Sequence, residues 1–121
     1  MTAYYDAVQR YFAAWNAATA EELEKAVAAA FTEDATYTDP FTDVRGHEAL
    51  AAAISGTQEQ FPGFTFRLLG EVDGHHALAR FGWELVSGAD GSAPVAGSDV
   101  IALAEDGRIA SVSGFLDRLP S

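Results

Sequence analysis

The sequence has no cysteine, and its 121 residues include only seven basic side chains against eighteen acidic ones. Without cysteine there is neither a disulfide framework nor thiol chemistry, which fits a cytoplasmic protein. The net charge of −11 opposes binding to phosphate backbones and to anionic membranes. We therefore expect no nucleic acid and no membrane among the partners of this protein.

Long hydrophobic runs are also missing. The first six residues, MTAYYD, carry neither a basic n-region nor an apolar h-region, so we expect no signal peptide. No apolar run approaches the roughly 20 residues that span a bilayer. Hydrophobic residues nevertheless make up 49% of the chain, which is enough for a globular core and excludes a disordered protein. The length predicts one domain, residues 1–121, with a single core.

The first half of the chain has helical periodicity. Residues 2–17 place their apolar side chains on one helix face, at i, i+4, i+7, i+8 and i+11: Tyr4, Val8, Tyr11, Phe12 and Trp15. Thr19 begins a capping-box pattern, which predicts a second helix ending near Phe31. A third, alanine-rich helix is predicted over 47–55, with Gly56 as its C-terminal glycine.

The second half alternates with a period of two. Hairpin signals at Asp73-Gly74 and Asp106-Gly107, and a longer polar turn over 87–94, divide it into strands. We predict four consecutive antiparallel strands, over residues 64–69, 77–85, 95–104 and 109–119.

One earlier strand is predicted over 35–39, and residues 42–46 are predicted to form a loop. Helices that are segregated from a run of hairpin strands are typical of the α+β class. We therefore predict a cone-shaped α+β domain, in which three N-terminal helices pack on a strongly curved, mostly antiparallel sheet. Such a cone has an interior pocket, which is a usual place for a small-molecule site.

Asp39 ends the alternating stretch of the early strand. Ala35, Tyr37 and Asp39 share one side of that strand, and Pro40 biases Asp39 toward extended backbone. If that side faces the interior, Asp39 is a buried acid, which costs free energy unless it is paired or takes part in chemistry. The alternative is an Asp-Pro turn, in which Asp39 accepts a hydrogen bond from the loop that follows.

Asp99 is a second unusual acid, because it lies among apolar residues of a predicted strand with no cation within four residues. By strand parity it shares a face with Ile101 and Leu103, and acids are seldom buried without a partner. The alternative is that this face is exposed. Tyr11 lies on the apolar face of the first helix, so its hydroxyl needs a partner in the interior.

Metal and cofactor motifs are not evident. His75 and His76 are adjacent, so in a strand they would point to opposite faces and could not share a metal ion. The sequence contains no nucleotide-binding glycine fingerprint, nucleophile elbow or zinc signature. We therefore expect neither a metal nor a cofactor.

Several segments together resemble one family. They are Val8–Ala14 (VQRYFAA), residues 28–34, Ala35–Pro40 (ATYTDP), Arg45-Gly46 with the helix that follows, and Asp99. In order and spacing they are similar to the Δ5-3-ketosteroid isomerases over nearly the whole chain, with close residue matches in the first third. These isomerases belong to the cone-shaped superfamily related to nuclear transport factor 2, which also contains the SnoaL-like polyketide cyclases.

The resemblance implies roles for three residues. In the isomerases, a tyrosine of the first helix and a protonated aspartate of a later strand form an oxyanion hole, and an aspartate before proline is the general base. These roles would fall on Tyr11, Asp99 and Asp39, respectively. The sequence departs from the pattern at Phe31 and Ile54, which stand where several isomerases carry tyrosines of the supporting hydrogen-bond network.

The resemblance therefore implies a cofactor-independent isomerase or cyclase that abstracts a proton next to a carbonyl of a small apolar molecule and stabilises the enolate. We expect the substrate to contact aromatic and apolar side chains: Trp15, Phe31, Phe41, Ile54, Phe81, Trp83 and Phe115. We also expect a homodimer through the outer sheet face, with Arg67, Arg80 and Trp83 as candidate positions. The alternative function is a non-catalytic domain of the same fold that binds a small ligand or another protein.

Overall fold

The computed structural model describes residues 2–120 and has α+β architecture, as predicted. The elements in chain order are α1 (Thr2–Trp15), α2 (Ala20–Ala30), β1 (Phe31–Thr38), β2 (Asp43–Arg45), α3 (His47–Gln60), β3 (Phe64–His75), β4 (Leu78–Ser87), β5 (Val95–Leu103) and β6 (Ile109–Arg118). None of the helices formed by residues 2–120 is long and apolar enough to cross a membrane.

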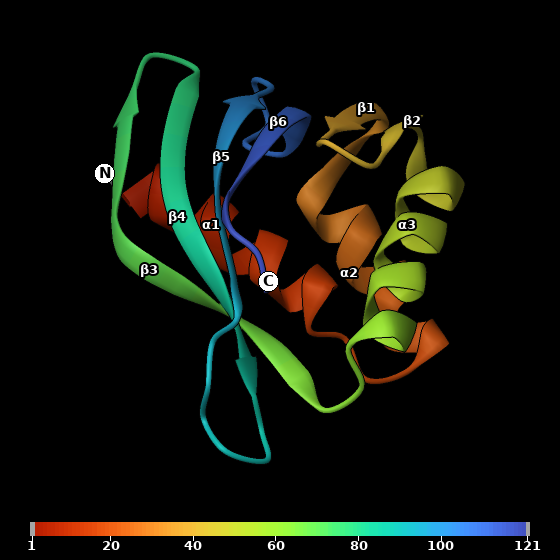
Figure 1. The fold of residues 1–121 in the computed structure, drawn as a ribbon. Helices are drawn as coiled ribbons and strands as arrows, with labels where there is room; N and C mark the ends of the chain where they lie inside the picture. Colours follow the sequence, from red (N-terminus) through yellow and green to blue (C-terminus); the bar gives the residue numbers. More distant parts are fainter. Residues whose placement is uncertain (1, 121) are drawn as a thin grey trace.

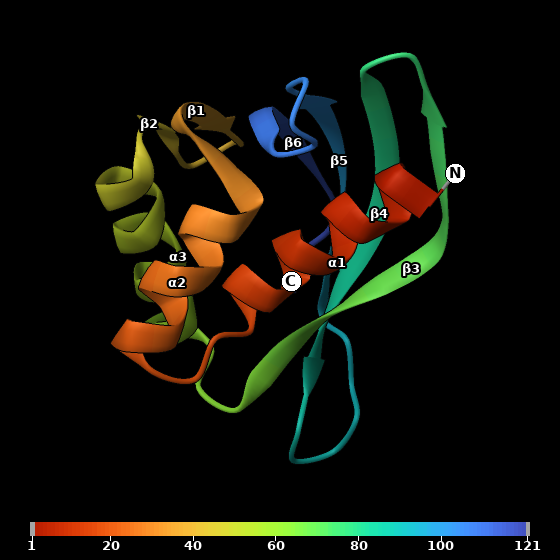
Figure 2. The ribbon, with the colours of Figure 1, turned by 180° about the vertical axis from the view of Figure 1, so that it is seen from behind.

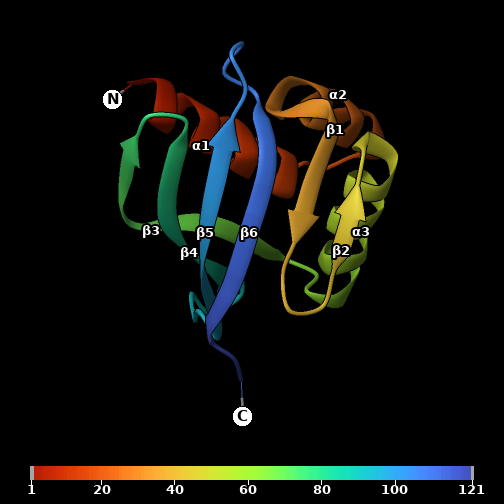
Figure 3. The ribbon, with the colours of Figure 1, turned by 90° about the horizontal axis from the view of Figure 1, so that it is seen from above.

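The strands form one mixed sheet in the order β2-β1-β6-β5-β4-β3, which Figure 3 shows from above. The meander β3-β4-β5-β6 is antiparallel throughout, whereas β1 pairs with β6 in parallel. The ladder of β3 and β4 shifts register between Leu69 and Asp73. Such an irregularity increases local twist and bends the strand. The long strands accordingly curve around the helices (Figure 1).

Helix α1 crosses the concave face of the sheet (Figure 2). Helices α2 and α3 lie beside the end of the sheet that β1 and β2 form. The predicted apolar face of α1 is buried at Val8, Tyr11, Phe12 and Trp15. Tyr11 packs edge-to-face on Phe81 of β4, with ring centroids 5.4 Å apart. Full burial of each such side chain contributes roughly 1.5–3 kcal/mol, so this face attaches the helix to the sheet.

Helix α2 begins where the sequence predicts. The hydroxyl of Thr19 accepts a hydrogen bond from the backbone N–H of Glu22 at 3.1 Å, and the Glu22 carboxylate accepts one from the N–H of Ala18 at 3.1 Å. These contacts satisfy two backbone donors that the helix itself leaves free. The helix then runs directly into β1 at Phe31.

Three local predictions are wrong. Gly56 does not end α3, which continues to Gln60 with Gly56 at an exposed position within the helix. Residues 43–45, predicted as loop, form β2 by pairing with the edge of β1. The β3–β4 turn falls at His76-Ala77 and not at Asp73-Gly74, with His76 in the left-handed region at φ 50°.

Candidate active site

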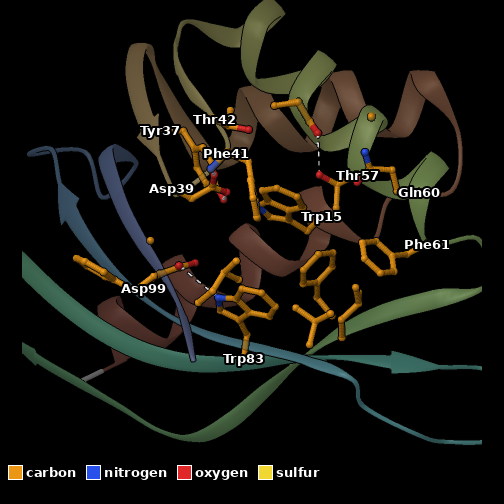
Figure 4. A pocket seen from close by; sticks show the side chains of 18 of the residues that line it. Trp15, Tyr37, Asp39, Phe41, Thr42, Thr57, Gln60, Phe61, Trp83 and Asp99 are labelled. Atoms are coloured by element: carbon orange, nitrogen blue, oxygen red, sulfur yellow. Dashed lines mark hydrogen bonds between the residues drawn. The ribbon is translucent and has the colours of Figure 1, made fainter. Parts of the chain in front are cut away.

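A cavity of about 740 Å³ opens between the concave sheet face, α1, α3 and the loop after β1. Its lining contains all three residues to which the family resemblance assigns roles, Tyr11, Asp39 and Asp99. Figure 4 shows Asp39 and Asp99 on the same side of this cavity. Most of the remaining lining is aromatic or aliphatic, so the two acids face a mainly apolar space.

Asp39 combines the two arrangements that its sequence context allows. It lines the cavity on the same side of the chain as Tyr37, whose hydroxyl donates to Asp39 Oδ2 at 2.6 Å. It also closes the Asp-Pro turn, because Oδ1 accepts the backbone N–H of Phe41 at 2.9 Å. The side chain is only partly buried. Donors on both oxygens fix the orientation of the Asp39 carboxyl group.

Asp99 lies on the inner face of β5 together with Ile101, as strand parity predicts, and is 2% exposed. Its Oδ2 accepts a hydrogen bond from the Tyr11 hydroxyl at 2.7 Å, and its Oδ1 accepts one from the Trp83 indole N–H at 3.3 Å. Burial raises the pKa of Asp99 to about 6; the two donors act against this shift, and the nearby charge of Asp39 adds to it. Asp99 can therefore hold its proton up to about pH 6.

The two tyrosines remain protonated. Burial, with a further contribution from Asp99, raises the pKa of Tyr11 well above its ordinary value. Burial and the hydrogen bond to Asp39 likewise raise the pKa of Tyr37. Both hydroxyls are therefore donors in the working pH range, one to each acid.

Gly114 on β6 lies between the two acids. A methyl group at this position would come within 2.8 Å of Asp99 Oδ1 and 3.4 Å of the Asp39 side chain. The absence of a side chain on Gly114 thus leaves space where both carboxyl groups can approach the same bound molecule.

The other residues expected at the pocket separate into two groups. Trp15, Phe41, Trp83 and Phe115 line the cavity, and Phe41 and Phe115 lie at its exposed edge, with 78% and 61% of their surface accessible. In contrast, the expected pocket positions Phe31, Ile54 and Phe81 are not among its lining residues; they are buried in the hydrophobic core. Each is enclosed by neighbouring helix and strand side chains, so these three placements were wrong.

Trp83 is also misplaced as a candidate dimer contact, because its ring faces the cavity. Arg67 and Arg80 are exposed on the opposite face of the sheet. There Arg67 and Arg118 both pair with Glu84, and this pairing holds the pKa of Glu84 below its ordinary value. The homodimer itself stays a prediction.

Two contacts of the site were not predicted, Tyr37 with Asp39 and Trp83 with Asp99. The first could have been inferred, because residues two apart on a strand share a face. The second depends on the register of β4 against β5, which pairs Phe81 with Asp99. No local pattern encodes that register. Within residues 2–120, no three His, Asp or Glu side chains are placed to hold a metal ion.

A curved sheet closed by helices around a pocket gives this chain the fold of the nuclear transport factor 2-like proteins. More narrowly, the family model of the SnoaL-like domain matches residues 8–112, and the chain belongs to that family.

Solved structures agree with this assignment. One, described as a proposed isomerase of the SnoaL-like family from Agrobacterium tumefaciens, is 40% identical with a TM-score of 0.91, over 97% of this chain and 99% of that chain. A proposed polyketide cyclase from Sinorhizobium meliloti is 20% identical with a TM-score of 0.70, over 90% and 93% of the two chains. A nuclear transport factor 2-like protein from Exiguobacterium is 20% identical with a TM-score of 0.72, over 92% and 98%. The last two support the fold alone. No curated protein matches the chain significantly.

Proposed function

We propose that this protein is a small-molecule isomerase or cyclase that moves a proton next to a carbonyl group and stabilises the enolate formed. The observation that carries the proposal is the meeting of Tyr11, Asp39 and Asp99 in one mainly apolar cavity. The 40% identical structure described as a proposed isomerase supports the same class of reaction.

Asp39 is the proposed base. Its carboxylate takes the proton from the carbon next to the carbonyl, and the electron pair of the broken C–H bond becomes the enolate. Returning that proton to another carbon of the same molecule completes an isomerisation. The reaction therefore needs no cofactor. Because Tyr37 and the Phe41 N–H hold one oxygen each, the carboxylate is already oriented before the substrate binds.

Tyr11 and Asp99 are the proposed donors to the enolate oxygen. Preorganised donors in a site with little water stabilise developing negative charge far better than the same groups do in water. Asp99 can donate only when it is protonated, and its burial favours that state. Protonated Asp99 can alternatively donate to the Tyr11 oxygen across the same 2.7 Å contact with Asp99 Oδ2, and it then acts on the enolate through Tyr11 and not by a direct hydrogen bond. Tyr11 then has its own proton available for the substrate.

The lining suits an apolar carbonyl compound. Trp15, Phe66 and Trp83 provide aromatic surface inside, and Phe41 and Phe115 extend it to the opening. The runner-up function, a non-catalytic binding domain, requires neither acid to face the cavity. The burial of Asp99 at the cavity favours the catalytic proposal, because burying an acid costs free energy and an apolar ligand gains nothing from its presence.

The test is the rate at which the protein converts an activated β,γ-unsaturated ketone into its conjugated isomer. We expect Asp39→Asn to lower kcat/KM by roughly 10²- to 10⁴-fold, the range of general-base catalysis. Asp34→Asn is the matched control, since Asp34 lies on β1, the strand that Asp39 follows, but is exposed and outside the cavity. Unchanged turnover in Asp39→Asn, or an equal loss in both variants, would refute the proposal.

A further inference from the structure

The cavity contains a hydrogen-bond donor that the proposed mechanism does not use. Within residues 2–120, Trp15 Nε1 is a buried side-chain nitrogen without a hydrogen-bond partner. The Trp15 side chain is only 6% exposed and lines the same cavity as the two acids. A buried donor without an acceptor is costly and rare in native structures, so its presence at a cavity calls for an explanation.

The surroundings of Trp15 indicate which acceptor it serves. Trp15 follows Tyr11 by one helical turn, and the two ring centroids are 6.1 Å apart. On its other side, the Trp15 ring packs on Tyr37 at 5.6 Å, and Figure 4 shows Trp15 beside the Tyr37–Asp39 pair. Trp15 therefore lies between the two tyrosines that donate to the two acids.

The Tyr11 hydroxyl oxygen is the better acceptor of the two. The Trp15 side chain lowers the pKa of Tyr11, acting against the larger effects of burial and of Asp99, so it lies near the Tyr11 hydroxyl although the two are not hydrogen-bonded in this structure. In the resting protein Tyr11 donates to Asp99, and its oxygen has a lone pair left. When a hydroxyl donates to an anion, its own oxygen becomes more negative and accepts a further hydrogen bond more strongly.

We propose that Trp15 is a positioning residue of the anion site, whose indole N–H bonds to the Tyr11 oxygen when Tyr11 donates to an anionic ligand. The chain of donors then runs from Trp15 through Tyr11 to the ligand oxygen. The ligand class is an apolar molecule with one enolate- or phenolate-like oxygen at the inner end of the cavity. This inference rests on the proposed function, because it assumes that Tyr11 faces the developing charge.

The first measurement is the indole N–H signal of Trp15 in a ¹H–¹⁵N NMR spectrum of the unmodified protein. The chain has two tryptophans, so a Trp83→Phe variant is enough to assign the two signals. The probe is a series of substituted naphthols of falling pKa. We expect the Trp15 signal to move downfield and to exchange more slowly with water on binding, and to move further as more of the bound naphthol is anionic.

The second measurement replaces Trp15 by benzothienylalanine, which keeps the shape of the ring and lacks the N–H. We expect naphthol affinity to fall roughly tenfold, as for the loss of one hydrogen bond in an anionic network. The matched control ligand is the methyl ether of the same naphthol, whose affinity should not change. A purely structural role of Trp15 would weaken both ligands equally.

The outcomes separate this inference from the proposed function. If naphthols bind as anions but the Trp15 signal and the affinity of the benzothienylalanine variant stay unchanged, Trp15 has no part in the anion site and only this inference fails. If the wild-type protein binds no naphthol, there is no anion site, and the proposed function is overturned together with this inference.

Discussion

At the scale of single residues, the site depends on two acids that differ in their surroundings. Asp39 is partly exposed and accepts hydrogen bonds on both oxygens from Tyr37 and the Phe41 N–H. Asp99 is buried at 2% exposure, and desolvation is the largest influence on its pKa. The same side chain can thus serve as an ionised base in one place and as a neutral donor in the other.

The raised pKa of Asp99 has a consequence for stability. Asp99 binds its proton more tightly in the folded state, at a pKa of about 6, than at the ordinary 3.8. The contribution of Asp99 to the free energy of unfolding is therefore fully present below about pH 4 and is lost as pH rises through about 6. The loss amounts to about 3 kcal/mol, from a shift of about two units at 1.36 kcal/mol each.

The measurement is urea unfolding of the wild type and of Asp99→Asn between about pH 4 and pH 7. The asparagine cannot titrate, so the variant lacks the proton that Asp99 releases. We expect the free energy of unfolding of the wild type to fall relative to the variant as pH rises through this window. Parallel curves for the two proteins would contradict a raised pKa of Asp99.

At the scale of elements, β5 and β6 bring the acids together. Strand β6 pairs with β5 on one side and with β1 on the other, so it connects the strand of Asp99 to the strand that Asp39 follows. Gly114 of β6 stands directly opposite Asp99 and leaves the gap between the two acids open. The site therefore depends on the register of three strands.

Replacing two glycines of different elements by alanine should change the stability of the protein in opposite directions. Gly97 of β5 has Trp83 Cζ2 and the Phe115 carbonyl each 2.4 Å from where its Cβ would lie. We expect Gly97→Ala to cost about 1–3 kcal/mol through overpacking. Gly56 lies within α3 with nothing within 4 Å of that position. We expect Gly56→Ala to gain about 1 kcal/mol from helix propensity.

Urea unfolding midpoints of the two variants check this pair, with each variant serving as the control of the other. The account of β5 would be wrong if Gly97→Ala were as stable as the wild type. A destabilising Gly56→Ala would show that α3 ends near Gly56, as the sequence alone suggested.

The elements also show which side-chain placements can be predicted from the sequence. Parity along single strands correctly placed Asp39 with Tyr37 and Asp99 with Ile101, and periodicity correctly placed Tyr11 on the inner face of α1. Local patterns are sufficient for such placements, because a strand or helix has a fixed repeat.

Placements that depend on how one element packs on another could not be predicted from the sequence. Strand β2 exists because it pairs with β1, and nothing in the residues 43–45 themselves marks a strand. Whether an aromatic lines the cavity or fills the core depends on how α1 and α3 sit on the sheet. Phe81 and Trp83 share a face of β4, yet only Trp83 reaches the cavity. Sequence periodicity gives the same prediction for both.

At the scale of the whole molecule, the cone shape creates a mainly apolar cavity of about 740 Å³ that opens to the surface beside Phe41 and Phe115. The helices and the curved sheet bury Asp99 and partly bury Asp39, while the charge of −11 is carried mostly by exposed side chains. A low local dielectric is what allows one of two neighbouring acids to stay neutral. The fold thus provides the electrostatic contrast that the proposed reaction needs.

The pH dependence of kcat/KM for enone isomerisation tests this central claim most directly, because it reports the protonation states of the free protein. The proposed mechanism needs an ionised Asp39 and a protonated Asp99, whose pKa is about 6. We therefore expect kcat/KM of the wild type to decline as pH rises through about 6. In Asp99→Asn, where an amide donor replaces the acid, we expect residual activity without that decline. A rate that is flat or rising across this range in the wild type, or the same decline in Asp99→Asn, would contradict the assignment of Asp99 as a neutral donor to the enolate.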